Sequence, residues 1–191
     1  WRLEIKKYPR LTETGAWRVN RMDVPFYFRR NPEPGEPTPI GGFYTQEDVK
    51  EMVAYAAERQ IEIIPEIDMP AHSNAALAAY PELTCPIVKS YIGVIPGLGG
   101  GNSGVIYCAG KDSAFTFLQN VLDEVMALFP SRYIHLGGDE AQKGYWEKCP
   151  LCQARMKNEH LDNEEDLQGY FMKRMSDYVC SKGRKVIGWD E

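Results

Sequence analysis

Several features that would assign a chain to a broad class are missing from these 191 residues. No apolar run approaches the roughly 20 residues that a bilayer-spanning helix needs, so we predict no membrane span in this segment. No block of Lys or Arg occurs and the net charge is −5, which argues against nucleic acid as a partner. The first residue is Trp1 rather than Met, so the lack of a signal peptide decides nothing about export.

Histidine and cysteine are also scarce, with three and five residues respectively. The segment Cys149-Pro150-Leu151-Cys152 is a lone CxxC motif, whereas a zinc site would need a second pair or histidines at matching spacing. His160 is the only histidine nearby, so we predict no metal and interpret the motif as a short disulfide or two packed thiols. Cys85 and Cys108 flank a glycine-rich stretch that a disulfide between them could close. Such a bridge would suit an exported protein, so we predict a periplasmic, secreted or lysosome-like compartment.

The composition that is present, 43% hydrophobic and 26% charged residues, is that of an ordinary soluble globular domain. Apolar residues at helical spacing and β-branched runs alternate along the chain. They predict three helices, over about 45–59, 113–129 and 163–180, and three strands, over 61–68, 132–136 and 185–189. Residues 20–42 and 93–110 are rich in proline or glycine, and we predict long loops there, on the face where a substrate would lie.

The order of these elements predicts an α/β fold. Strands that alternate with helices call for right-handed crossovers and a parallel sheet. Polar or aromatic residues at the C-terminal ends of the strands fit a (β/α)8 TIM barrel, which takes eight strands and about 250 residues. We therefore predict that residues 1–191 are the central part of a catalytic (β/α)8 barrel domain, about strands 3 to 5, truncated at both ends.

The most informative run is Tyr133-Ile134-His135-Leu136-Gly137-Gly138-Asp139-Glu140. It has the pattern of a buried strand followed by two glycines, which leave room for a ligand close to the backbone. Asp139 and Glu140 then lie at the C-terminal end of the strand, where α/β folds keep their chemistry. The plainer interpretation is a strand end with a solvated acidic loop. His135, inside the strand, is interpreted as a packed, hydrogen-bonded residue.

Two neighbouring acids suggest a glycosidase with divided duties. A glycosidase usually needs a proton donor for the leaving oxygen and a carboxylate that stabilises the positive charge on the sugar. Glu140 is the candidate donor. Asp139 is poorly placed as an ordinary nucleophile, because adjacent residues of an extended segment point in opposite directions and a retaining pair is about 5 Å apart across the scissile bond. Asp139 is therefore predicted to orient a group on the substrate.

The chain resembles the family 20 glycoside hydrolases, the β-N-acetylhexosaminidases. His135 to Glu140 resembles the family signature His-x-Gly-Gly-Asp-Glu. Glu66 to His72 is similar to its third-strand Glu-x-Asp-x-Pro-Gly-His, and Trp189 matches the tryptophan that ends the fifth strand. Trp1 to Ile5 and Gly42 to Asp48 resemble the segment after the second strand and a helix entry. The resemblance covers nearly the whole chain.

This resemblance implies substrate-assisted retaining catalysis on terminal non-reducing β-linked GlcNAc or GalNAc, without a cofactor. Asp139 would accept a hydrogen bond from the acetamido N–H of the sugar, Glu140 would protonate the leaving oxygen, and His72 would support the acid. Trp189 would form one wall of the pocket around the acetamido group. The expected substrates are amino-sugar glycans or chito-oligosaccharides. Ala71 stands where the family has glycine, which is tolerable only if its φ is negative.

Two other functions stay open at this point. The first is a metal-dependent hydrolase with Asp68, His72, Asp139 and Glu140 as ligands, although so few histidines argue against it. The second is a catalytically inactive sugar-binding barrel, since fold alone does not prove activity. The family's sugar-gripping arginine and its later aromatic residues are absent from these residues, so we expect the fragment alone to be inactive.

Overall fold

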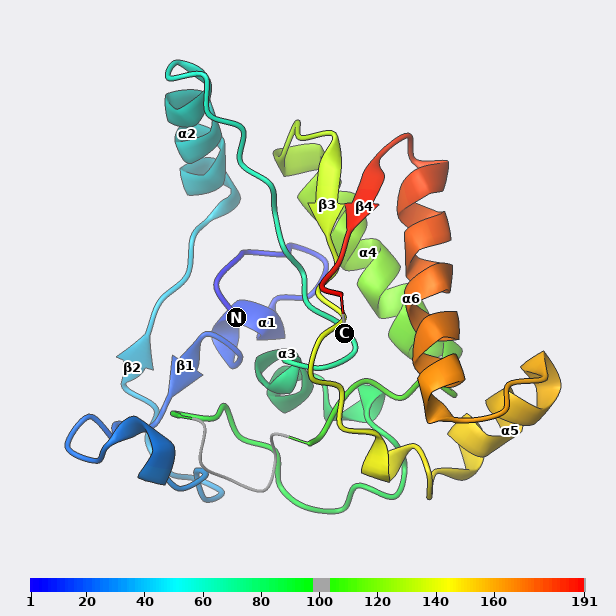
Figure 1. The fold of residues 1–191 in the computed structure, drawn as a ribbon. Coiled ribbons are helices and arrows are strands. Elements are labelled where there is room, and N and C mark those ends of the chain that lie inside the picture. The colour runs from blue at the N-terminus through cyan, green and yellow to red at the C-terminus, as the bar shows by residue number, and fades with distance from the viewer. Residues whose placement is uncertain (98–103, 191) are drawn as a thin grey trace.

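The computed structural model describes residues 1–97 and 104–190. Part of the predicted loop 93–110 therefore lies outside the described residues. Figure 1 shows the fold, in which helices outnumber strands. The helices are α1 (Arg10–Glu13), α2 (Gln46–Ala57), α3 (Asn74–Ala79), α4 (Asp112–Leu128), α5 (Pro150–Glu159) and α6 (Glu164–Ser181). The strands are β1 (Trp17–Arg18), β2 (Ile40–Gly41), β3 (Tyr133–His135) and β4 (Lys185–Ile187), and 3-10 turns occupy Phe26–Phe28, Pro81–Leu83 and Lys143–Tyr145.

The parallel pairing predicted for the last two strands is confirmed. β3 and β4 pair in parallel, with Ile134 opposite Val186, and α6 lies in the crossover between them. The third predicted strand, 61–68, is wrong as a full strand. Only one bridge forms, between Glu66 and His135, because Pro65 has no N–H to donate and residues 61–64 pair with no other described segment.

The predicted helices are all present, with ends shifted by a few residues. The capping box at the start of α2 is complete: the Asp48 N–H donates to Thr45 Oγ1 over 3.1 Å, and the Thr45 N–H donates to Asp48 Oδ2 over 2.8 Å. Asn163 caps α6 in the same way by accepting from the Asp166 N–H over 2.8 Å. Each cap satisfies backbone donors that the first helical turn would leave unpaired.

The core lies between the β3–β4 pair and the long helices α4 and α6, which Figure 1 shows packed together. The apolar stripe predicted for 113–129 faces inward, since Leu118, Val121, Leu122 and Val125 are all fully buried. The stripe of α6 meets it, and the rings of Phe115 and Phe171 are 4.7 Å apart between centroids. Each such side chain contributes about 1.5–3 kcal/mol of burial energy. This packing fixes the position of β3 and the residues that follow it.

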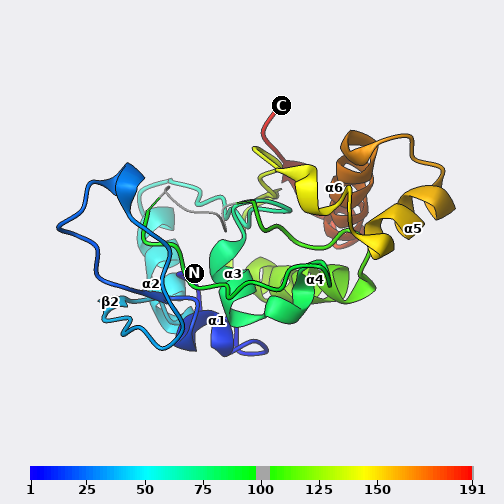
Figure 2. The ribbon, with the colours of Figure 1, turned by 90° about the horizontal axis from the view of Figure 1, so that it is seen from below.

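The segment 20–42 forms an arm at the opposite side of the molecule from α5 and α6, as the views of Figures 1 and 2 agree. It is mostly irregular, as predicted, apart from the 3-10 turn Phe26–Phe28 and strand β2, which pairs antiparallel with β1. The residues that the structure describes do not form a closed barrel. None of their helices has both the length and the apolar character that a membrane span requires.

Candidate active site

After β3 the chain passes through two positions, 137 and 138, whose backbone conformation favours glycine. Gly137 and Gly138 have φ values of +70° and +106°, a region that disfavours other residues. A Cβ on Gly137 would also lie 1.8 Å from Asp68 Oδ1. Asp68 in turn accepts a hydrogen bond from the Gly138 N–H over 3.4 Å, and the Gln168 side chain donates to the Gly138 carbonyl over 2.7 Å. The turn that presents the next two acids is therefore held from both sides.

We expect Gly137→Ala to destabilise the complete catalytic domain by about 2–4 kcal/mol, because the added methyl group is strained in φ and collides with Asp68. Gly144→Ala is the matched control, since a Cβ there would meet no atom within 4 Å. Thermal unfolding of the two variants beside the parent measures the difference. Equal melting temperatures for both variants would show that the turn does not need glycine.

The structure brings Asp139, Glu140 and His72 together. His72 Nε2 lies 3.1 Å from Asp139 Oδ2 and 3.3 Å from Glu140 Oε2. The expectation that neighbouring acids point in opposite directions is wrong here, because Glu140 has φ +50° and the chain is not extended at that residue. His72 is also left-handed, with φ +47°, whereas Ala71 is not, which meets the condition set for its replacement of glycine. One imidazole nitrogen thus contacts both carboxylates.

The two acids differ in their surroundings. The Asp139 side chain is 21% exposed and that of Glu140 is 71% exposed. Asp139 Oδ1 is buried and has no hydrogen-bond partner among the described residues. A buried carboxylate oxygen normally accepts a hydrogen bond. Asp139 therefore suits a fixed acceptor for a substrate N–H, and the open position of Glu140 suits proton exchange with a leaving group or water.

Asp68 lies close to Asp139, and the pKa of its carboxyl group is raised. Burial, followed by the charge of nearby Asp139, raises the pKa of Asp68 from 3.8 to about 6. Between about pH 4 and pH 6 the folded chain holds a proton that the unfolded chain has released, so stability falls as the pH rises through this window. Asp68 shapes the turn, as predicted from the sequence, because its Oδ1 accepts from Gly138.

We expect Asp68→Asn to raise the free energy of unfolding at pH 7 by up to about 1 kcal/mol, a value discounted because the carboxyl is only half-buried. Asparagine keeps an acceptor for the Gly138 N–H but carries no charge. Near pH 4 the gain should disappear, since Asp68 is then protonated in the folded chain. Urea unfolding of the complete domain at both pH values measures this, with Asp23→Asn, at an exposed position, as control. A gain of equal size at both pH values would contradict the assigned cause.

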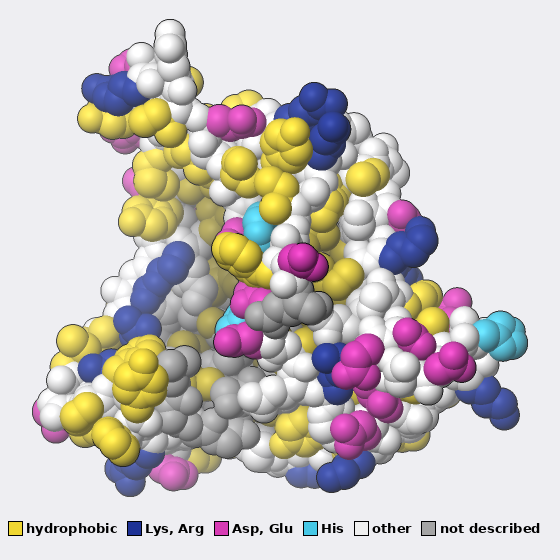
Figure 3. Space-filling model, in the orientation of Figure 1, with side chains coloured by type: hydrophobic (Ala, Val, Ile, Leu, Met, Phe, Trp, Pro, Cys, Tyr) yellow, Lys and Arg dark blue, Asp and Glu magenta, His cyan; other side chains and the backbone are white. Residues whose placement is uncertain are grey.

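A cavity of about 840 Å³ opens beside the acids and is lined by His72, Glu140, Asn74, Lys143 and the first residues of the chain. Figure 3 shows histidine and acidic side chains gathered around the hollow on this face. Trp189 does not line this cavity. It lies in a neighbouring one of about 460 Å³ with Gly137 and Gly138. The structure thus brings three of the four predicted site residues into contact. Trp189 lies beside the turn that precedes the acids, where its backbone N–H donates to the Gly137 carbonyl over 2.9 Å.

Trp189 is held by residues that the sequence did not single out as functional. Its indole N–H donates to Glu66 Oε1 over 3.1 Å, and its ring lies 4.9 Å from that of His135. His135 accepts from the Gly137 N–H over 3.0 Å, in agreement with its predicted packing role. Glu66 is two residues before Asp68 in an extended segment, so both side chains point to the same face. That spacing was the available signal for Glu66.

One group of residues near the acids could bind a cation. Ligand atoms of Asp68, His72 and Asp139 all lie within 4.8 Å of one another. Two carboxylates and one imidazole are a donor set that divalent metals accept. The same atoms are already used within the chain, since Asp68 accepts from Gly138 and His72 contacts both acids. The geometry therefore leaves the hydrolase with a bound metal as a rival to be tested.

Comparisons with known proteins identify the family of this chain. The model of glycosyl hydrolase family 20, catalytic domain, matches residues 1–191. A beta-hexosaminidase of Porphyromonas gingivalis is 47% identical over the whole chain, which covers 22% of that protein, and one of Vibrio furnissii is 42% identical, with 30% covered. The chain thus spans less than a third of the length of these two curated relatives.

Solved structures give the same result. The crystal structure of a beta-N-acetylhexosaminidase from Bacteroides fragilis matches 99% of this chain with a TM-score of 0.77 and 48% identity, and 33% of that protein is covered. A Vibrio harveyi exo beta-N-acetylglucosaminidase, solved with N-acetylglucosamine, matches all of this chain with a TM-score of 0.79 and 34% identity, and 28% of it is covered. These neighbours imply a TIM-barrel family. The chain therefore belongs to glycosyl hydrolase family 20.

Proposed function

We propose that the chain is part of an exo-acting β-N-acetylhexosaminidase that removes terminal non-reducing β-linked GlcNAc or GalNAc by substrate-assisted retaining catalysis. The chain would supply about strands 3 to 5 of a (β/α)8 barrel that further strands complete. Relatives at 42–48% identity carry the names beta-hexosaminidase and beta-N-acetylhexosaminidase, which supports the activity. The small share of each relative that the chain covers supports its place within a larger domain.

One observation carries the proposal: two adjacent carboxylates meet a single histidine nitrogen beside a cavity. Two acids this close on one chain cannot flank a glycosidic bond from opposite faces of a sugar ring, as the ordinary two-carboxylate mechanism needs. An attacking group must then come from elsewhere. The substrate's own 2-acetamido oxygen can supply it, and substrate-assisted enzymes of this family are known exceptions to the two-carboxylate scheme.

The proposed reaction has two steps. The acetamido oxygen attacks the anomeric carbon while the bond to the leaving oxygen breaks, and that oxygen takes its proton from Glu140. Water then attacks the anomeric carbon of the oxazolinium-like intermediate and loses a proton to Glu140, which restores the acid and the acetamido group. Asp139 accepts from the acetamido N–H through an oxygen that the chain leaves unpaired, and its charge stabilises the positive charge that develops there.

Trp189 enters this proposal as an apolar wall for the acetamido group, reached from the neighbouring cavity. Trp189 is 56% exposed, so part of its surface is open to a ligand. A methyl group and a sugar face are suited to an aromatic plate. Amino-sugar glycans and chito-oligosaccharides would then be the substrates, and the Vibrio harveyi relative was solved with N-acetylglucosamine.

The experiment that separates this proposal from the metal-dependent rival uses the complete catalytic domain and an aryl N-acetyl-β-glucosaminide. After a brief exposure to EDTA, added Mg²⁺ or Mn²⁺ should not raise the rate of hydrolysis, because no step passes through a metal. A rate that depends on the added ion and is lost in His72→Ala would favour an ion at Asp68, His72 and Asp139. No hydrolysis under any condition would favour the inactive sugar-binding barrel.

A further inference from the structure

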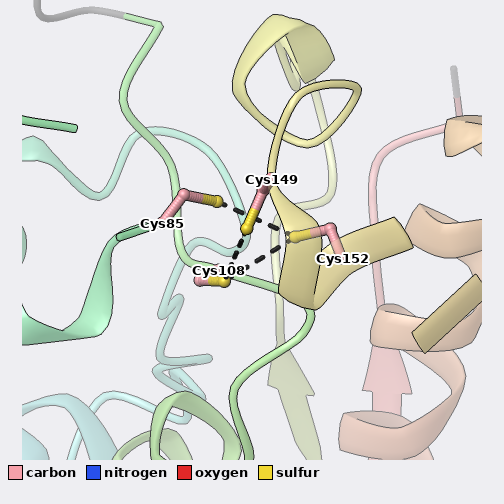
Figure 4. A group of neighbouring side chains, drawn as sticks. All are labelled: Cys85, Cys108, Cys149 and Cys152. Carbon is pink, nitrogen blue, oxygen red and sulfur yellow. Dashed lines mark hydrogen bonds between the residues drawn. The ribbon is translucent and has the colours of Figure 1, made fainter. Parts of the chain in front are cut away.

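Four of the five cysteines, Cys85, Cys108, Cys149 and Cys152, converge at one buried point (Figure 4). Cys85 follows the 3-10 turn Pro81–Leu83, Cys108 precedes α4, and Cys149 and Cys152 lie at the start of α5. Each of the four is at most 1% exposed, and none is in a disulfide. The hypothesis of a Cys85–Cys108 bridge is therefore wrong for this structure, and of the two interpretations of the CxxC motif the packed thiols hold rather than the short disulfide.

The four sulfur atoms all lie within 4.8 Å of one another, and three of the distances between them match those in a zinc site. The Sγ atoms of Cys85 and Cys152 are 3.7 Å apart, those of Cys108 and Cys149 3.8 Å, and those of Cys108 and Cys152 3.6 Å. A disulfide needs about 2.0 Å. Four sulfurs at the corners of a tetrahedron, each about 2.3 Å from a central zinc ion, lie about 3.8 Å from one another.

The backbone around the sulfurs is arranged to support thiolates. The Gly110 N–H donates to the sulfur of Cys108. A Cβ on Gly110 would lie 2.2 Å from the carbonyl carbon of Leu151, so only glycine allows this loop to approach the CxxC backbone so closely. Cys149 is the N-cap of α5 and Cys152 is in its first turn, where the helix dipole favours negative charge. Donors to the ligand atoms are the usual surroundings of a metal site.

We propose that Cys85, Cys108, Cys149 and Cys152 bind one Zn²⁺ ion as a structural tetrathiolate site. Four thiolate ligands close the coordination shell and leave no position for substrate or water, which is the hallmark of a structural zinc. The ion would join three segments that are distant in sequence. Cys149 ends the stretch that follows β3 and carries Asp139 and Glu140, so the ion would anchor the far end of the active-site loop. The sequence did not indicate this site, because Cys85 and Cys108, the second pair, are themselves far apart in sequence.

The test is the metal content of the full-length protein, purified without chelators and with its thiols reduced. We expect inductively coupled plasma mass spectrometry to find one zinc ion per chain. Replacing that zinc with Co²⁺ should give the intense thiolate-to-cobalt absorption of tetrahedral sulfur ligation. Loss of an outer-shell partner lowers metal affinity by about 10–100-fold. Cys108→Ser removes a ligand itself, so it should weaken zinc binding by more than that. Cys180→Ser is the control, because Cys180 is exposed and outside the cluster, and it should keep its zinc.

A second measurement covers the case in which Cys108→Ser does not fold. In the unaltered protein, alkylation should modify the exposed Cys180 at once. Titration of the four clustered thiols with a mercurial reagent should release one zinc per chain, which a zinc-sensitive dye measures. Two disulfides among the four cysteines, found by mass, would overturn the proposal. So would four reduced thiols that react freely and take up neither Zn²⁺ nor Co²⁺, and an iron centre would overturn the assignment to zinc. None of these outcomes depends on whether the protein hydrolyses a hexosaminide.

Discussion

Glu140→Gln in the complete catalytic domain should lower kcat for an aryl N-acetyl-β-glucosaminide by about 10²–10⁴-fold, the range that a positioned general acid contributes. Glutamine has nearly the same shape but holds no proton that it can release. KM should change little, because the side chain is 71% exposed and its proposed role is to protonate the leaving oxygen. Steady-state kinetics over a range of pH measures both constants.

Glu147→Gln is the matched control for this substitution. Glu147 lies on the same stretch between β3 and α5 and is exposed, so it tests the effect of removing a nearby charge. The control should keep the parent rate. Undiminished turnover in Glu140→Gln would remove Glu140 from the mechanism. A loss of equal size in both variants would show that the rate depends on the total negative charge near the site and not on the proton of Glu140.

Asp139→Asn should lower kcat by about 10²–10³-fold, similar to the removal of one preorganised electrostatic contact in other active sites. The amide has the size of the carboxylate but cannot stabilise the positive charge that develops on the acetamido group. The melting temperature should stay near that of the parent, because Asp139 Oδ2 contacts only His72 and Oδ1 has no partner among the described residues. Kinetics and thermal unfolding on the same preparation separate the two effects.

Asp162→Asn removes a charge at an exposed position before α6 and controls for net charge. Asp139→Asn with a normal rate would mean that the charge of Asp139 has no role. A variant that melts far below the parent would mean that the contact with His72 is structural. In that case the loss of activity could not be assigned to catalysis.

Much of the fold follows from local patterns in the sequence. The helices α2, α4 and α6 have strong caps or long apolar stripes, and the structure confirms all three. The short helices α1, α3 and α5 were not predicted, because four to ten residues carry too little periodicity to stand out. The 61–68 strand failed for a different reason. Its β-branched residues fit a sheet, but among the described residues it pairs with β3 alone, and only at its C-terminal end.

The site shows the same division between local and long-range information. The sequence identified Asp139, Glu140 and His72 by their motifs, but not the left-handed conformation of Glu140 that lets both acids reach one nitrogen. The sequence did not indicate the four-cysteine cluster, because its members come from three segments that only the folded chain brings together. The prediction of an exported compartment was based on a Cys85–Cys108 disulfide, which the structure lacks. Fractionation of the cells that make this protein would test that prediction.

The central claim is that the substrate supplies the attacking atom while the acid pair shares the remaining work. The most direct measurement compares two aryl β-glucosides that differ only at carbon 2, one with an acetamido group and one with a hydroxyl group, on the complete catalytic domain. The account predicts that kcat/KM falls by at least about 10³-fold without the amide, since an intramolecular nucleophile is worth several kcal/mol of barrier. Equal rates on the two substrates would contradict it.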